Sequence, residues 1–180
     1  VLMPNTNNHS IPLVKRVLII GNGGRESSLA WALSNAKGIE QIYIAPGNGG
    51  TEGIKTCQNL DIKEDNVDQI IKACLSRHIN LVIVGPEAPL ANGLADLLRE
   101  AGIVVFGPGK NGAQLESSKT WAKDLMKEAG IPTAKYWVIR TVKEALKIIE
   151  GTNQPLVVKA DGLAAGKGVT IPKNFNETIA

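Results

Sequence analysis

The feature that most constrains this chain is a series of short, uninterrupted apolar segments separated by amphipathic ones. The apolar segments are 16–20, 41–45, 80–84 and 103–106. A strand that is apolar on both sides is typical of a parallel sheet covered on both faces. The segments with apolar residues at helical spacing are 25–37, 64–78 and 91–101. Strands that alternate with helices predict right-handed crossovers, so we expect an open parallel α/β sheet of Rossmann type over residues 15–109.

The pattern changes near Gly109–Gly112, where we place a domain boundary. The elements expected beyond it are one long helix at 111–129, a strand at 135–140, a helix at 142–150, strands at 155–160 and 168–171, and a helix start that Asn176 caps. The last two strands flank a glycine-rich turn, which indicates an antiparallel hairpin. Because a hairpin and two helices bury too little surface for a core, we interpret residues 110–180 as a linker helix and an incomplete α+β domain.

Composition excludes several classes of protein. The 20 basic and 17 acidic residues give a net charge of +3 without a basic run, which argues against nucleic-acid binding. No stretch approaches the roughly 18 apolar residues of a membrane helix. Residues 1–14 lack the basic start and apolar centre of a signal peptide, so we expect a disordered tail. Cys57 and Cys74 stand in unrelated contexts, which predicts reduced thiols and a cytoplasmic protein.

Glycine, at 19 of 180 residues, is over-represented and gathers in a few loops, where backbone N–H groups can approach a ligand closely. The first loop, GNGGRE at 21–26, joins the first strand to the first helix. It fails the dinucleotide fingerprint, because Glu26 takes the third glycine position and no acid ends the second strand. We therefore predict a phosphate or phosphosugar site at Gly23, Gly24, Arg25 and Glu26, with a tight turn that binds nothing as the alternative.

Two further loops follow the second and third strands. The first of them, APGNGGT, offers Asn48, Gly49 and Thr51 as binding residues, or is merely a flexible turn. The other begins at Gly85 and Pro86 and brings Glu87 to a strand's carboxyl end, where a carboxylate can hold a ribose diol or an amine. An ordinary solvated acid is the alternative. Gly107-Pro108-Gly109 is interpreted as a hinge.

The fourth loop, KADGLAAGKGV at 159–169, is not a Walker A motif, because no hydroxyl residue follows Lys167 and a hairpin replaces the expected helix. Lysines beside small, mobile residues are typical of a lid over triphosphate. The candidate ATP-binding residues here are Lys159, Gly162, Gly166, Lys167 and Gly168. A surface hairpin that happens to carry lysines is the alternative.

The motifs GNGGRE, APGNGGT, VGPEAPL, FGP, LESSK, GIPTA and VVKADGLAAGKGV resemble the phosphoribosylamine–glycine ligase (glycinamide ribonucleotide synthetase) family of the ATP-grasp superfamily. The resemblance implies a pre-ATP-grasp domain that binds phosphoribosylamine, followed by the start of an ATP-grasp domain. It implies ligation of glycine to 5-phosphoribosylamine, with ATP forming a glycyl phosphate, in purine synthesis. Lys119 and Lys159 match two superfamily lysines that contact ATP phosphates, and Gly162–Gly168 matches the mobile loop.

The resemblance also implies Mg²⁺, with its ligands beyond residue 180, so we expect residues 1–180 alone to be inactive. The sequence departs from the family at Ser27 and Ser28, where the family usually has His and a small Ala. Two alternatives remain open. One is a sibling ATP-grasp ligase with another substrate, and the other is a non-enzymatic phosphosugar-binding module.

Overall fold

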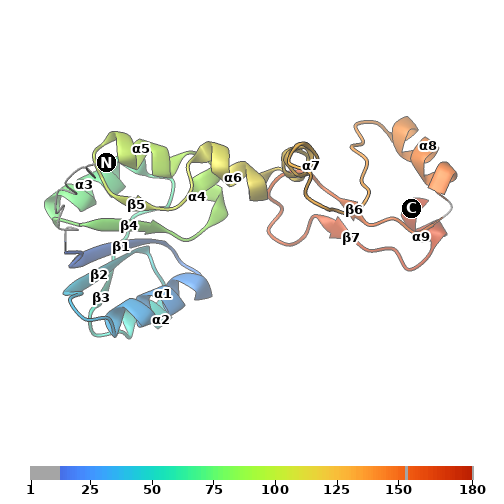
Figure 1. Cartoon of the computed structure of the whole chain (residues 1–180). Helices are drawn as coiled ribbons and strands as arrows, with labels where there is room; N and C mark the ends of the chain where they lie inside the picture. Colours follow the sequence, from blue (N-terminus) through green and yellow to red (C-terminus); the bar gives the residue numbers. More distant parts are fainter. Residues whose placement is uncertain (1–12, 153, 180) are drawn as a thin grey trace, which may run out of the picture. The chain divides into compact units, whose positions relative to one another are not determined.

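The computed structural model describes residues 13–152 and 154–179, and the chain divides into two compact units between Gly109 and Lys110. The described part of the first unit holds a five-stranded parallel sheet in the order β3-β2-β1-β4-β5 (Figure 1). The strands are β1 (Arg16–Gly21), β2 (Gln41–Pro46), β3 (Cys57–Asn59), β4 (Leu81–Val84) and β5 (Val105–Phe106). The predicted α/β class with a parallel sheet is confirmed. Residues 1–12 of the predicted tail lie outside the described residues.

Helices cover both faces of this sheet, which explains why its strands are apolar on both sides. The helices are α1 (Gly24–Ser34), α2 (Gly49–Glu52), α3 (Val67–Ser76), α4 (Glu87–Ala91) and α5 (Leu94–Glu100). Helices α1 and α2 lie on one side and α3 and α5 on the other (Figure 1). Ile19 is in register with Ile44 and Ile83, and all three belong to a core cluster that also holds Ala30 of α1. Successive β1 residues point to opposite faces, so Leu18 and Ile20 face the other helical layer.

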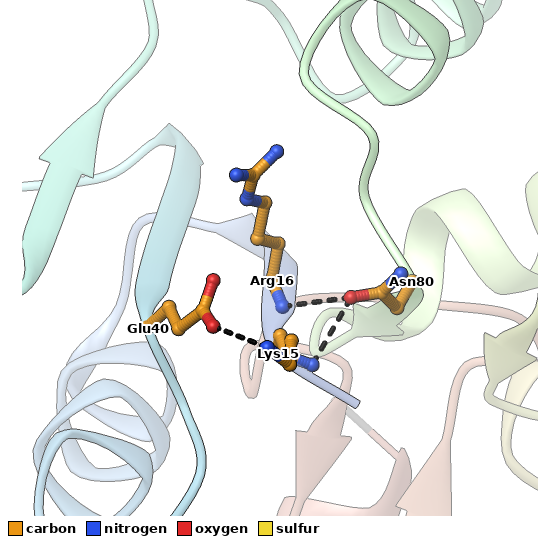
Figure 2. Close-up of polar contacts among 4 residues, drawn as sticks. All are labelled: Lys15, Arg16, Glu40 and Asn80. Atoms are coloured by element: carbon orange, nitrogen blue, oxygen red, sulfur yellow. Dashed lines mark hydrogen bonds and ion pairs between the residues drawn. The ribbon is translucent and has the colours of Figure 1, made fainter. Parts of the chain in front are cut away.

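The amino edge of the sheet is held by a small set of polar contacts, shown in Figure 2. The backbone N–H groups of Lys15 and Arg16 both donate to Oδ1 of Asn80 at 3.0 Å, which ties β1 to the start of β4. The Lys15 ammonium lies 2.6 Å from the Glu40 carboxylate before β2. The hydrogen bond from Lys15 lowers the pKa of the Glu40 carboxyl. These contacts define the end of the sheet opposite to the glycine loops.

The second unit consists of short elements. They are α6 (Lys110–Ser117), α7 (Lys119–Glu128), α8 (Val142–Thr152), β6 (Val158–Lys159), β7 (Val169–Thr170) and α9 (Phe175–Ile179). Strands β6 and β7 pair antiparallel, as predicted for a hairpin. Ala113, Ala122 and Ile149 are buried, whereas apolar side chains such as Val142 and Ile171 are exposed. The described residues of this unit therefore bury little apolar surface by themselves.

Several predicted elements differ from the structure. The expected single helix over 111–129 is wrong: Ser118 has an extended backbone and caps a separate helix, α7, by accepting the N–H of Trp121. The strand expected at 135–140 is also wrong, since residues 131–140, all of them described, form neither helix nor strand. Helix α9 begins after Asn174, whose side chain accepts the N–H of Glu177, so Asn176 is not its cap.

We expect Ile44→Ala to lower the free energy of unfolding of the first unit by about 2–5 kcal/mol, because it leaves a cavity in the middle of the sheet. Ile44 is 0% exposed, whereas the side chain of Val104 is 60% exposed, so Val104→Ala is the matched control and should change little. Urea titration followed by far-ultraviolet circular dichroism measures both. Equal losses in the two variants would contradict the core assignment.

Candidate functional site at the carboxyl edge of the sheet

The glycine loops of the first unit gather at one edge of the sheet, because the carboxyl ends of parallel strands all lie there. Loops 21–24 and 85–87 follow β1 and β4, which are neighbours, while β2 and β3 extend the sheet on the other side of β1. The strand order therefore reverses between β1 and β4. Ligands in open α/β sheets bind at such a switch point.

Glu26 fills the space between these two loops. It is only 4% exposed, and its Oε2 accepts the N–H of Gly23 at 2.7 Å. A methyl group at Gly21 would come within 2.6 Å of the Glu26 carboxyl carbon, and one at Gly85 would overlap its Oε1. Gly21 also has a φ of +128°, a conformation that side chains rarely adopt. Glu26 stands at the third glycine position of the dinucleotide fingerprint, and its carboxylate occupies the gap between β1 and β4.

Arg25, which precedes Glu26 in α1, reaches across the same gap to the exposed side. Its guanidinium donates to the carbonyl of Gly85 and lies 3.6 Å from the Glu87 carboxylate. Both side chains are partly exposed, so the pair contributes little to stability. It does fix Glu87, the first residue of α4, beside the first turn of α1. Pro86 precedes Glu87 as the N-terminal cap of α4.

The loop after β2 is held together by its own polar side chains. Oδ1 of Asn48 accepts the N–H groups of Gly50 and Thr51, and its amide donates to the carbonyls of Asn22 and Gly23. We expected Thr51 to present its hydroxyl to a ligand, but Thr51 is 0% exposed. That hydroxyl lies 2.8 Å from the carbonyl oxygen of Asn48 and 2.7 Å from Oδ1 of Asn59, either of which can accept its proton. Thr51 therefore stabilises the conformation of the loop from within.

Ser27 connects the first turn of α1 with the loop that contains Asn48. Its hydroxyl lies 3.1 Å from Oδ1 and 3.0 Å from Nδ2 of Asn48. Ser28 instead donates to the carbonyl of Gly24 within its own helix. The hydroxyl at position 27 therefore fixes Asn48 against the first turn of α1.

Glu64 is an acid that the sequence analysis did not consider for the site. Burial raises the pKa of its carboxyl, and the negative charges of Glu26 and Asp65 raise it further. Glu64 was predicted as the first residue of the helix over 64–78, but it lies in the turn before α3, which begins at Val67. The Glu64 carboxyl is therefore within electrostatic range of the buried Glu26.

The second unit carries the other predicted residues. Lys159 lies on β6, and the glycine-rich loop that follows is closed at its base by the N–H of Ala160, which donates to the carbonyl of Gly168 at 2.7 Å. The ammonium of Lys119, the first residue of α7, donates to the carbonyl of Gly162 at 2.9 Å. Gly162 and Gly166 both have positive φ, and Lys167 is exposed at the tip. The structure thus brings Lys119 to the loop.

The described residues contain neither a cluster of metal ligands nor a membrane-spanning helix. In 13–152 and 154–179, no three His, Cys, Asp or Glu side chains are grouped so as to hold a metal ion. None of the helices in these same ranges is both long and apolar enough to cross a membrane.

An open parallel sheet with glycine-rich loops at its carboxyl edge, followed in sequence by a lysine-bearing glycine-rich hairpin, places the chain in the class of ATP-grasp proteins. Two family models match consecutive parts of the chain: "Phosphoribosylglycinamide synthetase, N domain" over residues 15–116, and "Phosphoribosylglycinamide synthetase, ATP-grasp (A) domain" over residues 117–180. The chain therefore belongs to the phosphoribosylglycinamide synthetase family.

Curated relatives agree with this assignment. The chain is 53% identical over 162 residues to the phosphoribosylamine–glycine ligase of a Nostoc species, covering 90% of this chain and 38% of that protein. It is 49% identical over 166 residues to the trifunctional purine biosynthetic protein adenosine-3 of Drosophila melanogaster, of which it covers 12%. The chain thus spans well under half of the length of these relatives.

Solved structures resemble the fold. The phosphoribosylamine–glycine ligase of Thermotoga maritima matches with a TM-score of 0.69 and 34% identity, over 91% of this chain and 37% of that one. The biotin carboxylase domain of Hydrogenobacter thermophilus 2-oxoglutarate carboxylase also has a TM-score of 0.69, at 24% identity, over 92% of this chain and 39% of that one. The second likeness concerns the fold alone.

We expect Gly85→Ala to destabilise the first unit by about 1–3 kcal/mol, because the added methyl group collides with the Glu26 carboxylate. In a Glu26→Ala background the same substitution should cost much less, since the obstructing atoms are gone. Urea denaturation of the wild type, the two single variants and the double variant measures this coupling. Strictly additive effects would show that Glu26 does not occupy the gap.

Proposed function

We propose that this chain is the amino-terminal part of an enzyme that ligates glycine to 5-phosphoribosylamine, using ATP, and so forms glycinamide ribonucleotide, ADP and phosphate. The observation that carries the proposal is the carboxyl edge of the first unit, where Glu26, Arg25 and Glu87 meet between β1 and β4. Membership of the family supports it. The proposed reaction belongs to the whole protein, of which this chain spans a part.

The phosphoribosylamine has three chemically distinct ends, and the edge of the sheet offers a group for each. The first intrahelical bond of α1 runs from Ser27 N–H to the Gly23 carbonyl, so the N–H groups of Gly24 and Arg25 precede the hydrogen-bond ladder. We assign the phosphate to this helix start, where N–H groups and the helix dipole favour an anion. The loop containing Asn48 and Gly49 lies beside it through the Asn48 amide.

Glu87 is assigned to the ribose hydroxyls. Its carboxylate is fixed by Arg25 yet partly exposed, so it can still accept hydrogen bonds from a diol. Glu26 is assigned an indirect part near the amine. It is buried, and one of its oxygens is held by Gly23, so it supplies negative charge at the base of the site and shapes the first loop.

The second unit is assigned to ATP. Phosphoryl transfer to the glycine carboxylate gives glycyl phosphate, and the amine of phosphoribosylamine then displaces the phosphate. Lys119, Lys159 and Lys167 supply positive charge of the kind that stabilises a transferring phosphoryl group. The glycine-rich loop can exclude water, which protects an acyl phosphate from hydrolysis. Cys57 and Cys74 are both free thiols, which agrees with our proposal that the protein acts in the reducing cytoplasm.

Two alternatives differ in their chemistry. A sibling ATP-grasp ligase would use ATP but accept another acid or amine, and a binding module would take the phosphosugar without releasing ADP. The family match favours neither of them. Release of ADP that requires both glycine and phosphoribosylamine, measured on the full-length enzyme, separates all three.

In the full-length enzyme we expect Glu87→Ala to raise KM for phosphoribosylamine about ten- to hundredfold, because the lost hydrogen bonds are to a charged acceptor. KM for ATP should stay within about twofold. Steady-state kinetics with each substrate varied in turn measures the split. Glu40→Ala removes the same charge at the opposite edge of the sheet and is the matched control. An unchanged KM for phosphoribosylamine in Glu87→Ala would remove Glu87 from the site.

A further inference from the structure

The start of the glycine-rich loop is bound to the start of α7 by one carboxylate. Oδ1 of Asp161 accepts the backbone N–H of Lys119 at 2.6 Å, that of Thr120 at 3.3 Å and that of Gly162 at 3.0 Å. The hydroxyl of Ser118 lies 3.5 and 3.4 Å from the two carboxylate oxygens. Asp161 is 42 residues from Lys119 in sequence, so these bonds join two distant segments of the second unit.

A second contact joins the same two segments. The ammonium of Lys119 donates to the carbonyl of Gly162, the residue that follows Asp161. Lys119 therefore donates to the loop through its backbone N–H, which bonds Asp161, and through its side chain. The first two residues of the loop are fixed to α7, whereas Ala164 and Lys167 are joined by a turn of their own at 2.8 Å.

The charge of Asp161 suits its position. A carboxylate at a helix start satisfies N–H groups that have no intrahelical partner and interacts favourably with the helix dipole. Partial desolvation acts to raise the pKa of Asp161, but the hydrogen bonds from Thr120, Lys119 and Gly162 together lower it. The group is therefore ionised at neutral pH. Asp161 therefore satisfies the first N–H groups of α7, which are those of Lys119 and Thr120.

We propose that Asp161 is a positioning residue for the ATP step. It holds the start of the glycine-rich loop, and with it Lys119 and Gly162, against α7, so that the loop beyond Gly162 moves about a fixed base. This inference rests on the proposed function, because it assumes that Lys119 and the loop serve ATP. Lys159 lies two residues before Asp161, on the strand that leads into the same base.

The test compares Asp161→Ala and Asp161→Asn with Glu144→Ala in the full-length enzyme. Glu144 is the matched control, because its carboxylate likewise accepts a backbone N–H, that of Arg140 at 2.8 Å, in the same unit but at α8. The first readout is limited proteolysis: trypsin cleavage after Lys167, followed by mass spectrometry. It needs no activity and therefore tests the attachment of the loop independently of the proposed function.

We expect Asp161→Ala to raise the rate of cleavage after Lys167 at least fivefold, because the loop opens more often once its base is released. Asp161→Asn keeps an acceptor oxygen and should restore most of the protection, and Glu144→Ala should match the wild type. Equal cleavage rates in Asp161→Ala and the wild type would overturn the proposal. So would equally raised rates in Asp161→Ala and Glu144→Ala, which would indicate a general loss of structure.

The second readout is kinetic. Asp161→Ala should raise KM for ATP about ten- to hundredfold, the range for a lost hydrogen bond to a charged group, with KM for phosphoribosylamine unchanged and partial rescue in Asp161→Asn. Raised cleavage with unchanged KM for ATP would overturn the positioning part. If the wild-type enzyme formed no glycinamide ribonucleotide, the proposed function would be overturned. Raised cleavage in Asp161→Ala would then still identify Asp161 as the residue that holds the loop.

Discussion

The candidate site depends on one buried carboxylate. Glu26 lies between the ends of β1 and β4, accepts the N–H of Gly23, and leaves no room for a side chain at Gly21 or Gly85. Because it closes the gap where the strand order reverses, the two loops can approach each other without a ligand between them. Arg25, beside it, is then directed across the gap to Glu87. Glu26, which is almost fully buried, thus positions the exposed groups that we assign to the substrate.

Both units fix a glycine-rich loop at a helix start with an acidic side chain, but in different surroundings. Glu26 acts from within α1 and is buried, whereas Asp161 acts from the loop on α7 and is exposed. The buried acid makes a permanent part of the sheet edge. The exposed one can be released at smaller cost, which suits the movement over a nucleotide that we propose for this loop.

The parallel sheet was predictable because β1, β2 and β4 are buried on both faces and their apolar runs are visible in sequence. Strand β3 (Cys57–Asn59) was not predicted because its three residues form no apolar run. Only its pairing with β2 defines it as a strand. The break at Ser118 was hidden by apolar spacing that continues through it, and is set by a cap. The glycine loops were found as candidates from sequence, but the burial of Glu26 and Thr51 was not, since the loop sequence does not tell which side chains fold inward.

The central claim is that the carboxyl edge of the first unit binds a phosphoribosyl group. Titration of the ¹⁵N-labelled chain with ribose 5-phosphate, followed by amide chemical shifts, tests it directly. The account predicts saturable shifts with one dissociation constant at Gly23, Gly24 and Glu87, and none at the amino edge around Lys15 and Asn80 (Figure 2). Shifts confined to the amino edge, or no shifts at the glycine loops at saturating ribose 5-phosphate, would contradict it.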